Sequence, residues 1–195
     1  RELIQLGAVH VKKGVRNVSF EGDKGFMYKA NLGLRTAIKI LKPIKTFKVL
    51  NEQDLYDQVY KMSWDKYMKC SGTLAVGATL NSMVFTHSHY VALKTKDAIV
   101  DKFRDTEGER PNVDLRFPDL KINVHIDRQV CTISLDSSGE SLHKRGYKTA
   151  TNIAPINEVL AAGMVLLSGY TGDENFIDPM CGSGGFLIHS RRFVS

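Results

Sequence analysis

The spacing of apolar and polar residues along the chain predicts a mixed α/β protein. Helical spacing of apolar positions predicts helices over 24–37, from 51 to about 62, over 89–103 and over 156–167. Alternation of apolar and polar positions predicts strands over 8–12, 17–21, 39–49, 73–78, 120–126 and 130–135. In the middle of the chain, the order helix, strand, helix, strand, strand favours a small α/β sandwich.

The first and last segments of the sequence each resemble an incomplete structural element. Residues 1–7 read as the last turns of a helix that ends at a glycine cap, Gly7. Residues 176–178 read as a strand that leads into a glycine turn and a new helix. Because a strand and a helix without partners cannot bury their apolar faces, we expect the sequence to be part of a longer protein.

Composition narrows the class of protein. Hydrophobic residues make up 43% and charged residues 25% of the chain, which excludes a wholly disordered or fibrous protein. The longest mainly apolar stretch, 159–167, is far shorter than the roughly 20 residues of a membrane span, and no signal peptide opens the sequence. The three cysteines form no CxxC pair, and His87 and His89 have no further ligand at metal-binding spacing. We therefore expect a cytoplasmic protein with reduced cysteines and no metal site.

The positive charge lies at one end of the sequence. Residues 1–50 hold 11 Lys and Arg against 3 Asp and Glu, whereas residues 51–110 and 111–195 each hold 8 against 9. A basic region attracts a phosphate backbone over long distances. A basic surface that serves solubility alone is the alternative at this point.

The sharpest motif is Asp-Pro-Met-Cys-Gly-Ser-Gly over residues 178–184. An apolar segment leads to an acidic residue, and a glycine turn that a ligand can approach closely opens a helix. The segment lacks the G-K-[ST] ending of a Walker loop, and Leu187 occupies the position of the third glycine of the dinucleotide fingerprint. The motif therefore indicates the cofactor turn of an S-adenosylmethionine-dependent methyltransferase. An ordinary strand-to-helix turn is the alternative.

This turn resembles the first motif of the THUMP-domain RNA methyltransferases, and other segments match that family in the same order. They are residues 96–101, 110–114, 138–147 and 154–162. Within the family, the sequence is most similar to the enzymes that methylate guanine N2 in bacterial 23S ribosomal RNA. The resemblance implies an α/β chain with a ferredoxin-like piece (1–45), a THUMP domain (46–138, with a start that could lie near 28) and the first strand and helix of a Rossmann-like methyltransferase domain (139–195).

The resemblance also implies S-adenosyl-L-methionine as the cofactor. Asp178 would lie beside the methionine part of the cofactor, Gly182 and Gly184 would let the backbone pass under it, and Pro155 would form a wall of the same pocket. The cofactor-binding residues expected from the resemblance are Asp178, Pro179, Cys181, Gly182, Ser183, Gly184 and Pro155.

The partner that the resemblance implies is structured RNA, namely 23S ribosomal RNA, and the basic first quarter of the chain agrees with it. We expect Lys42, Lys45 and Lys48 to form a row that faces solvent along the strand 39–49. Residues 142–147 could contact RNA or serve as a linker packed between domains. The expected phosphate contacts are Lys12, Lys13, Arg16, Lys42, Lys45, Lys48, Lys144 and Arg145.

No catalytic residue can be named from this sequence. The Asn/Asp-Pro-Pro-aromatic segment that orients the target amine in the family is not among the 195 residues, nor is the acidic residue that holds the cofactor ribose. We expect the full-length protein to be an enzyme and this chain alone to be inactive. The alternatives are a tRNA guanine or an N6-adenine methyltransferase of the same family, or a THUMP module that binds RNA without catalysis.

Overall fold

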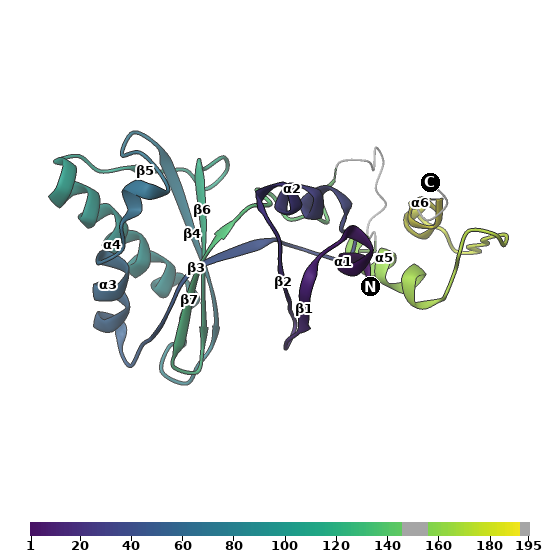
Figure 1. Cartoon of the computed structure of the whole chain (residues 1–195), viewed down its shortest axis with the longest axis horizontal. Helices are drawn as coiled ribbons and strands as arrows, with labels where there is room; N and C mark the ends of the chain where they lie inside the picture. The colour runs from purple at the N-terminus through teal and green to yellow at the C-terminus, as the bar shows by residue number, and fades with distance from the viewer. Residues whose placement is uncertain (146–155, 192–195) are drawn as a thin grey trace. The chain divides into compact units, whose positions relative to one another are not determined.

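The computed structural model describes residues 1–145 and 156–191 (Figure 1). The chain divides into two compact units. The first contains Arg1–Ile40 and Glu140–Ser195, and the second contains Leu41–Gly139. None of the helices in the described ranges is long and apolar enough to cross a membrane.

The N-terminal part of the first unit is built from two helices and a hairpin. Helix α1 (Glu2–Leu6) ends at Gly7, whose φ of 96° and backbone bond to Ile4 confirm the predicted glycine cap. Strands β1 (Val9–Lys13) and β2 (Val18–Glu21) pair antiparallel. Helix α2 (Lys24–Gly33) begins at Asp23, whose Oδ1 accepts a hydrogen bond from the Phe26 amide at 2.6 Å. Leu3, Ala30, Leu34 and Ile40 form the buried centre of this part.

Helix α2 is shorter than the sequence predicted, because it ends at Gly33 and not near residue 37. The backbone amides that follow bind a side chain in place of the next helical turn. The Glu2 carboxylate accepts hydrogen bonds from the amides of Arg35 (3.1 Å) and Thr36 (3.2 Å). A glycine at the last helical position and this competing acceptor together explain the early end.

The second unit is a five-stranded sheet with helices on one side (Figure 1). Its order is β3 (Leu41–Lys48), β7 (Val130–Asp136), β6 (Leu120–Asp127), β4 (Thr73–Asn81) and β5 (Asn112–Val113). Strands β4, β5 and β6 run parallel, while β7 runs antiparallel to both β3 and β6. Helices α3 (Glu52–Tyr60) and α4 (Ser88–Glu107) and the short helix η1 (Trp64–Lys66) complete the unit.

The core of the second unit lies between the sheet and its helices. Alternate residues of β6, Ile122, Val124 and Ile126, are buried there, as the sequence predicted. Cys131 and Ile133 of β7 are buried beside them. On the helical side, the core includes Leu55, Val59, Trp64, Val91, Ala98, Ile99 and Phe103.

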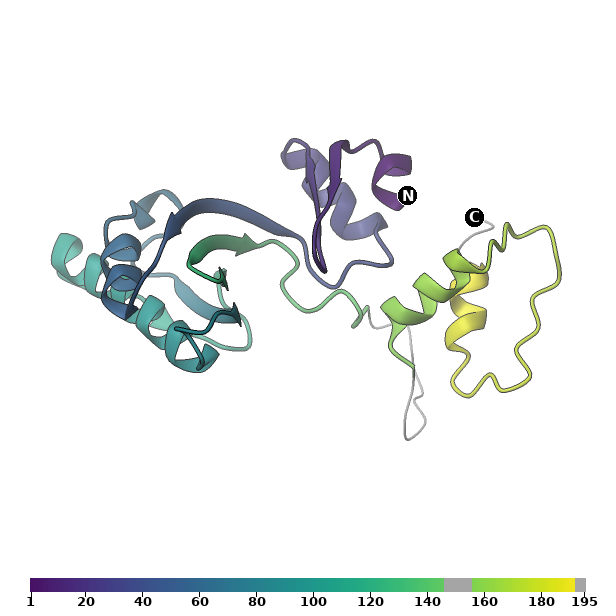
Figure 2. The ribbon, with the colours of Figure 1, turned by 90° about the horizontal axis from the view of Figure 1, so that it is seen from below.

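The C-terminal segment of the first unit consists of two packed helices joined by a long loop (Figure 2). Helix α5 (Glu158–Leu167) is capped by Asn157, whose side chain accepts a hydrogen bond from the Val159 amide at 3.0 Å. Helix α6 (Gly185–Arg191) follows the glycine turn. The strand predicted at 176–178 is absent from this segment, and that prediction was wrong for the chain as it stands. A strand requires a neighbour to share its hydrogen bonds, and no described strand pairs with these residues.

Candidate cofactor and nucleic-acid sites

The candidate cofactor turn, residues 178–184, is held by its own hydrogen bonds. The Asp178 carboxylate accepts a bond through Oδ1 from the Met180 amide at 3.1 Å. The Gly184 amide donates to the Cys181 carbonyl at 2.7 Å, and the Ile188 amide then donates to the Gly184 carbonyl at 2.9 Å. These bonds form a tight turn that passes directly into α6.

The two glycines of the turn adopt conformations that other residues avoid. Gly182 has φ 51° and Gly184 has φ 73°, both in the left-handed region. A Cβ atom placed on Gly184 would meet no other atom within 4 Å. The left-handed backbone conformation, rather than crowding by neighbouring atoms, is therefore the reason that glycine is favoured at position 184. The open space also allows a ligand to approach the backbone.

Asp178 provides the clearest sign that this turn fits a ligand. Its Oδ2 is buried and has no hydrogen-bond partner within residues 1–145 and 156–191. A buried carboxylate oxygen without a partner is costly, so a bound molecule with a hydrogen-bond donor would stabilise it. S-adenosylmethionine carries such donors on its amino group and ribose hydroxyls. The residues of the turn thus fit the cofactor that the motif indicates.

The other predicted cofactor-binding residues differ in their exposure. Pro179 and Cys181 are exposed, and Ser183 is half-buried. Pro155 lies outside the described residues. The sequence did not single out the aromatic pair that supports the loop before the turn: the rings of Tyr170 and Phe176 meet edge to face, with centroids 5.2 Å apart.

The tip of the β1–β2 hairpin carries three exposed basic residues. Lys12 and Lys13 lie at the end of β1, and Arg16 lies in the turn with φ 59°. The Gly14 amide closes this turn by donating to the Asn17 carbonyl at 2.9 Å. The structure therefore brings together three of the predicted phosphate contacts on one projecting element.

The predicted row of lysines on β3 does not form, and that prediction was wrong. A register shift lies between Pro43 and Lys45, and Lys45 pairs with Ile133, whose side chain is in the core. Lys45 accordingly points to the helical side of the sheet and donates to the Gln58 carbonyl at 3.3 Å. Lys48 lies three positions further along, on the opposite side of the sheet. Lys42, which pairs with Leu135, is on the same side as Lys45.

Arg145 has a role that the sequence did not reveal. Its guanidinium donates to the carbonyls of Asn31 (3.2 Å), Leu32 (3.1 Å) and Leu34 at the end of α2, and to that of Leu142 (3.1 Å). The structure thus uses this arginine to bind the end of a helix, where a positive charge is favourable. The preceding residue, Lys144, which was also predicted to contact phosphate, is exposed.

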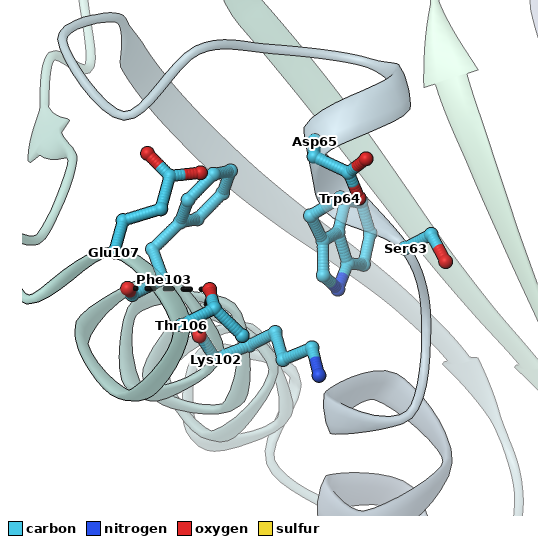
Figure 3. Close-up of a pocket in the computed structure, with 7 residues that line it drawn as sticks. All are labelled: Ser63, Trp64, Asp65, Lys102, Phe103, Thr106 and Glu107. Carbon is cyan, nitrogen blue, oxygen red and sulfur yellow. Dashed lines mark hydrogen bonds between the residues drawn. The ribbon is translucent and has the colours of Figure 1, made fainter.

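A shallow pocket of about 250 Å³ lies between η1 and α4 (Figure 3). Its walls include Trp64 and Phe103, which are buried core residues. The Lys102 ammonium at its edge lies 5.2 Å from the centre of the Tyr60 ring. The pocket is smaller than the roughly 300–1,000 Å³ typical of small-molecule sites, so we assign it no ligand.

Comparison with known families agrees with this arrangement. The model of the RlmL ferredoxin-like domain matches residues 1–41, that of the THUMP domain matches residues 49–136, and that of an RMKL-like methyltransferase domain matches residues 145–190. The chain belongs to the THUMP/RlmL-like RNA methyltransferase family. It carries the ferredoxin-like N-terminus, the THUMP domain and the start of the methyltransferase domain. The residue boundaries predicted for these parts, at 45 and 138, stay predictions.

Individual relatives show the same relationship. The chain is 43% identical over 190 residues to a candidate RNA methyltransferase of Synechocystis sp., covering 97% of this chain and 50% of the relative. It is 42% identical over 193 residues to the ribosomal RNA large subunit methyltransferase K/L of Syntrophotalea carbinolica, covering 97% of this chain and 27% of that protein. The crystal structure of SMU.472 complexed with SAH matches with a TM-score of 0.82 and 30% identity, over 97% of this chain and 50% of that one. The chain thus spans half or less of the length of these relatives.

Proposed function

We propose that the protein containing this chain transfers a methyl group from S-adenosylmethionine to N2 of a guanine in 23S ribosomal RNA, in the cytoplasm. The observation that carries the proposal is the Asp178–Gly184 turn, with its buried unpartnered carboxylate oxygen, in a chain that also contains a THUMP domain. The relative named as a ribosomal RNA large subunit methyltransferase supports the choice of ribosomal RNA.

The turn would hold the cofactor, which supplies an electrophilic methyl group when bound. Asp178 would accept a hydrogen bond from the cofactor through Oδ2, while its Oδ1 keeps the Met180 amide in place. Gly182 and Gly184 would allow close contact with the backbone, and Cys181 and Ser183 would line the turn. Pro155 stays a predicted wall of this pocket.

The basic hairpin would hold the RNA. Lys12, Lys13 and Arg16 are exposed together, so each can pair with a phosphate without first breaking a contact within the described chain. Lys42, Lys48 and Lys144 are also exposed and could add contacts at separate places. Lys45 and Arg145 already bind backbone carbonyls, so they contribute mainly to the fold.

Nucleoside analysis of ribosomal RNA tests the proposal. Deleting the gene should remove one N2-methylguanosine from 23S RNA, and the intact gene should restore it. An Asp178→Asn gene should not restore it. If the deletion instead removes a methylated guanosine from tRNA, or an N6-methyladenosine, the substrate assignment is wrong. If no methylated nucleoside changes, the methyltransferase proposal itself fails.

A further inference from the structure

A short loop of the second unit exposes three large apolar side chains. Val113, the last residue of β5, is 48% exposed, and between β5 and β6 Leu115 is 78% exposed and Phe117 is 79% exposed. Arg116 lies between the last two and is exposed as well. Single apolar residues on a surface are ordinary, whereas a group of them on one loop indicates an interaction site.

Hydrogen bonds fix this loop at both ends. At its start, Asp114 Oδ1 accepts bonds from the amides of Arg116 (2.8 Å) and Phe117 (3.0 Å). At its end, Asp119 Oδ2 accepts bonds from the amide (2.8 Å) and hydroxyl (3.0 Å) of Thr73 on β4. These bonds also hold the pKa of the Asp119 carboxyl below its ordinary value. Because the loop is already ordered, a partner could bind to Phe117 at little entropic cost.

We propose that this loop, residues 113–117, stacks an unpaired nucleobase of the RNA against Phe117 and Leu115, with Arg116 on a neighbouring phosphate. The inference rests on the proposed function, because it takes RNA as the partner. An aromatic ring can stack on any base. The Arg116 side chain has no hydrogen bond or ion pair within the described part of the chain, and its planar guanidinium suits a phosphate.

The position of the loop in the fold supports this partner. Strands β4, β5 and β6 are parallel, so the loops that precede them meet at one end of the sheet. Lys69 and Arg110, both exposed, lie in the other two loops. Glu107 and Glu109 lie near the same end: burial first, and then the charges of these two carboxylates, raise the pKa of the Cys70 thiol there. Because this end of the sheet carries both positively and negatively charged side chains, we expect stacking to contribute more to RNA binding here than net charge does.

The size of the exposed group favours a base over a protein surface. A stable protein interface involves about 20–30 residues on each side, with an apolar centre. Here, a single loop exposes three apolar side chains and one arginine. So small a group suits one nucleotide, with its base and phosphate, better than a protein surface.

The test measures the affinity of the full-length protein for two RNAs. One is a hairpin that has an unpaired loop, and the other is a fully paired duplex of the same stem. Phe117→Ala should weaken binding of the hairpin by about tenfold. It should leave the affinity for the duplex and the salt dependence unchanged. Phe117→Trp should restore binding of the hairpin. Met83→Ala is the matched control, because Met83 is 99% exposed beyond the opposite end of β4 and should have no effect.

Equal affinity of wild type and Phe117→Ala for the hairpin would overturn the inference. A fall in oligomeric mass caused by Phe117→Ala, measured by sedimentation, would also overturn it by assigning the loop to protein contact. A Lys12→Ala/Lys13→Ala variant separates the two proposals. If that variant loses affinity for both RNAs and shows a weaker salt dependence while Phe117→Ala has no effect, RNA binding stands and the stacking site fails. If the wild-type protein binds neither RNA, both proposals fail.

Discussion

At the scale of single residues, the two oxygens of the Asp178 carboxylate have different surroundings. Oδ1 accepts the Met180 amide and closes the turn, while Oδ2 is buried without a partner in the described chain. One oxygen therefore serves the fold, and the other has its hydrogen-bonding capacity unused within the described residues. This difference allows a substitution that affects one oxygen and spares the other.

Asp178→Asn in the full-length protein should weaken binding of S-adenosylhomocysteine by at least about tenfold. The amide oxygen can still accept the Met180 bond, so the turn should survive, whereas the amide nitrogen replaces an acceptor with a donor. Calorimetric titration measures the affinity, and thermal unfolding should show an unchanged Tm. The matched control is Asp173→Asn in the preceding loop, which should bind normally. Wild-type affinity in Asp178→Asn would show that Oδ2 does not contact the ligand.

At the scale of elements, Arg145 joins the segment that follows the second unit to the end of α2. Arg145→Ala should destabilise this end by about 2 kcal/mol, because three carbonyls of α2 and its C-cap lose a charged donor. Arg145→Lys should recover only part of the loss, since an ammonium cannot bind several carbonyls as a planar fork. Faster hydrogen exchange of the α2 amides would report the change. Lys144→Ala is the control, and equal exchange in both variants would contradict the role of Arg145.

The contact between α3 and α4 includes a tyrosine with a shifted pKa. The Tyr56 hydroxyl donates to Asp101 Oδ2 at 2.6 Å. This bond, together with burial, raises the pKa of Tyr56 from 10.0 to about 12. Because the folded protein favours the neutral phenol, its stabilising effect is complete below pH 10 and is lost as the pH rises toward about 12.

Tyr56→Phe should therefore lower the free energy of unfolding by about 1 kcal/mol at pH 8. The difference between wild type and variant should shrink between pH 10 and pH 12. Urea unfolding at several pH values measures both quantities. Tyr28→Phe, at an exposed tyrosine of the first unit, should show no such difference. A constant difference from pH 8 to pH 12 would mean that the bond to Asp101 does not set this pKa.

Local patterns made some elements predictable and left others hidden. The alternation in β6 and β7 fixed which residues face the core, because a strand presents alternate side chains to opposite sides. The row of lysines on β3 was wrong because Lys45 and Lys48 are three positions apart, and an odd spacing puts two side chains on opposite sides of a strand. The strand at 176–178 was wrong because a strand depends on a partner that local sequence does not specify.

At the scale of the whole molecule, the chain combines a basic hairpin, a THUMP domain and a candidate cofactor turn. The glycine turn was predictable because its chemistry lies within seven consecutive residues. The unpartnered oxygen of Asp178 and the binding of Arg145 to α2 were not predictable, since both depend on residues brought together by folding. The exposed loop at Phe117 was likewise visible only from burial.

The central claim is that this chain provides the RNA-binding and cofactor-binding parts of one RNA methyltransferase. The most direct test is transfer of labelled methyl groups from S-adenosylmethionine to protein-free 23S RNA by the full-length protein. We expect incorporation by the wild type, loss of incorporation in Asp178→Asn, and salt-sensitive loss in the Lys12→Ala/Lys13→Ala variant. Absence of transfer by the wild type, or full transfer by Asp178→Asn, would contradict the claim.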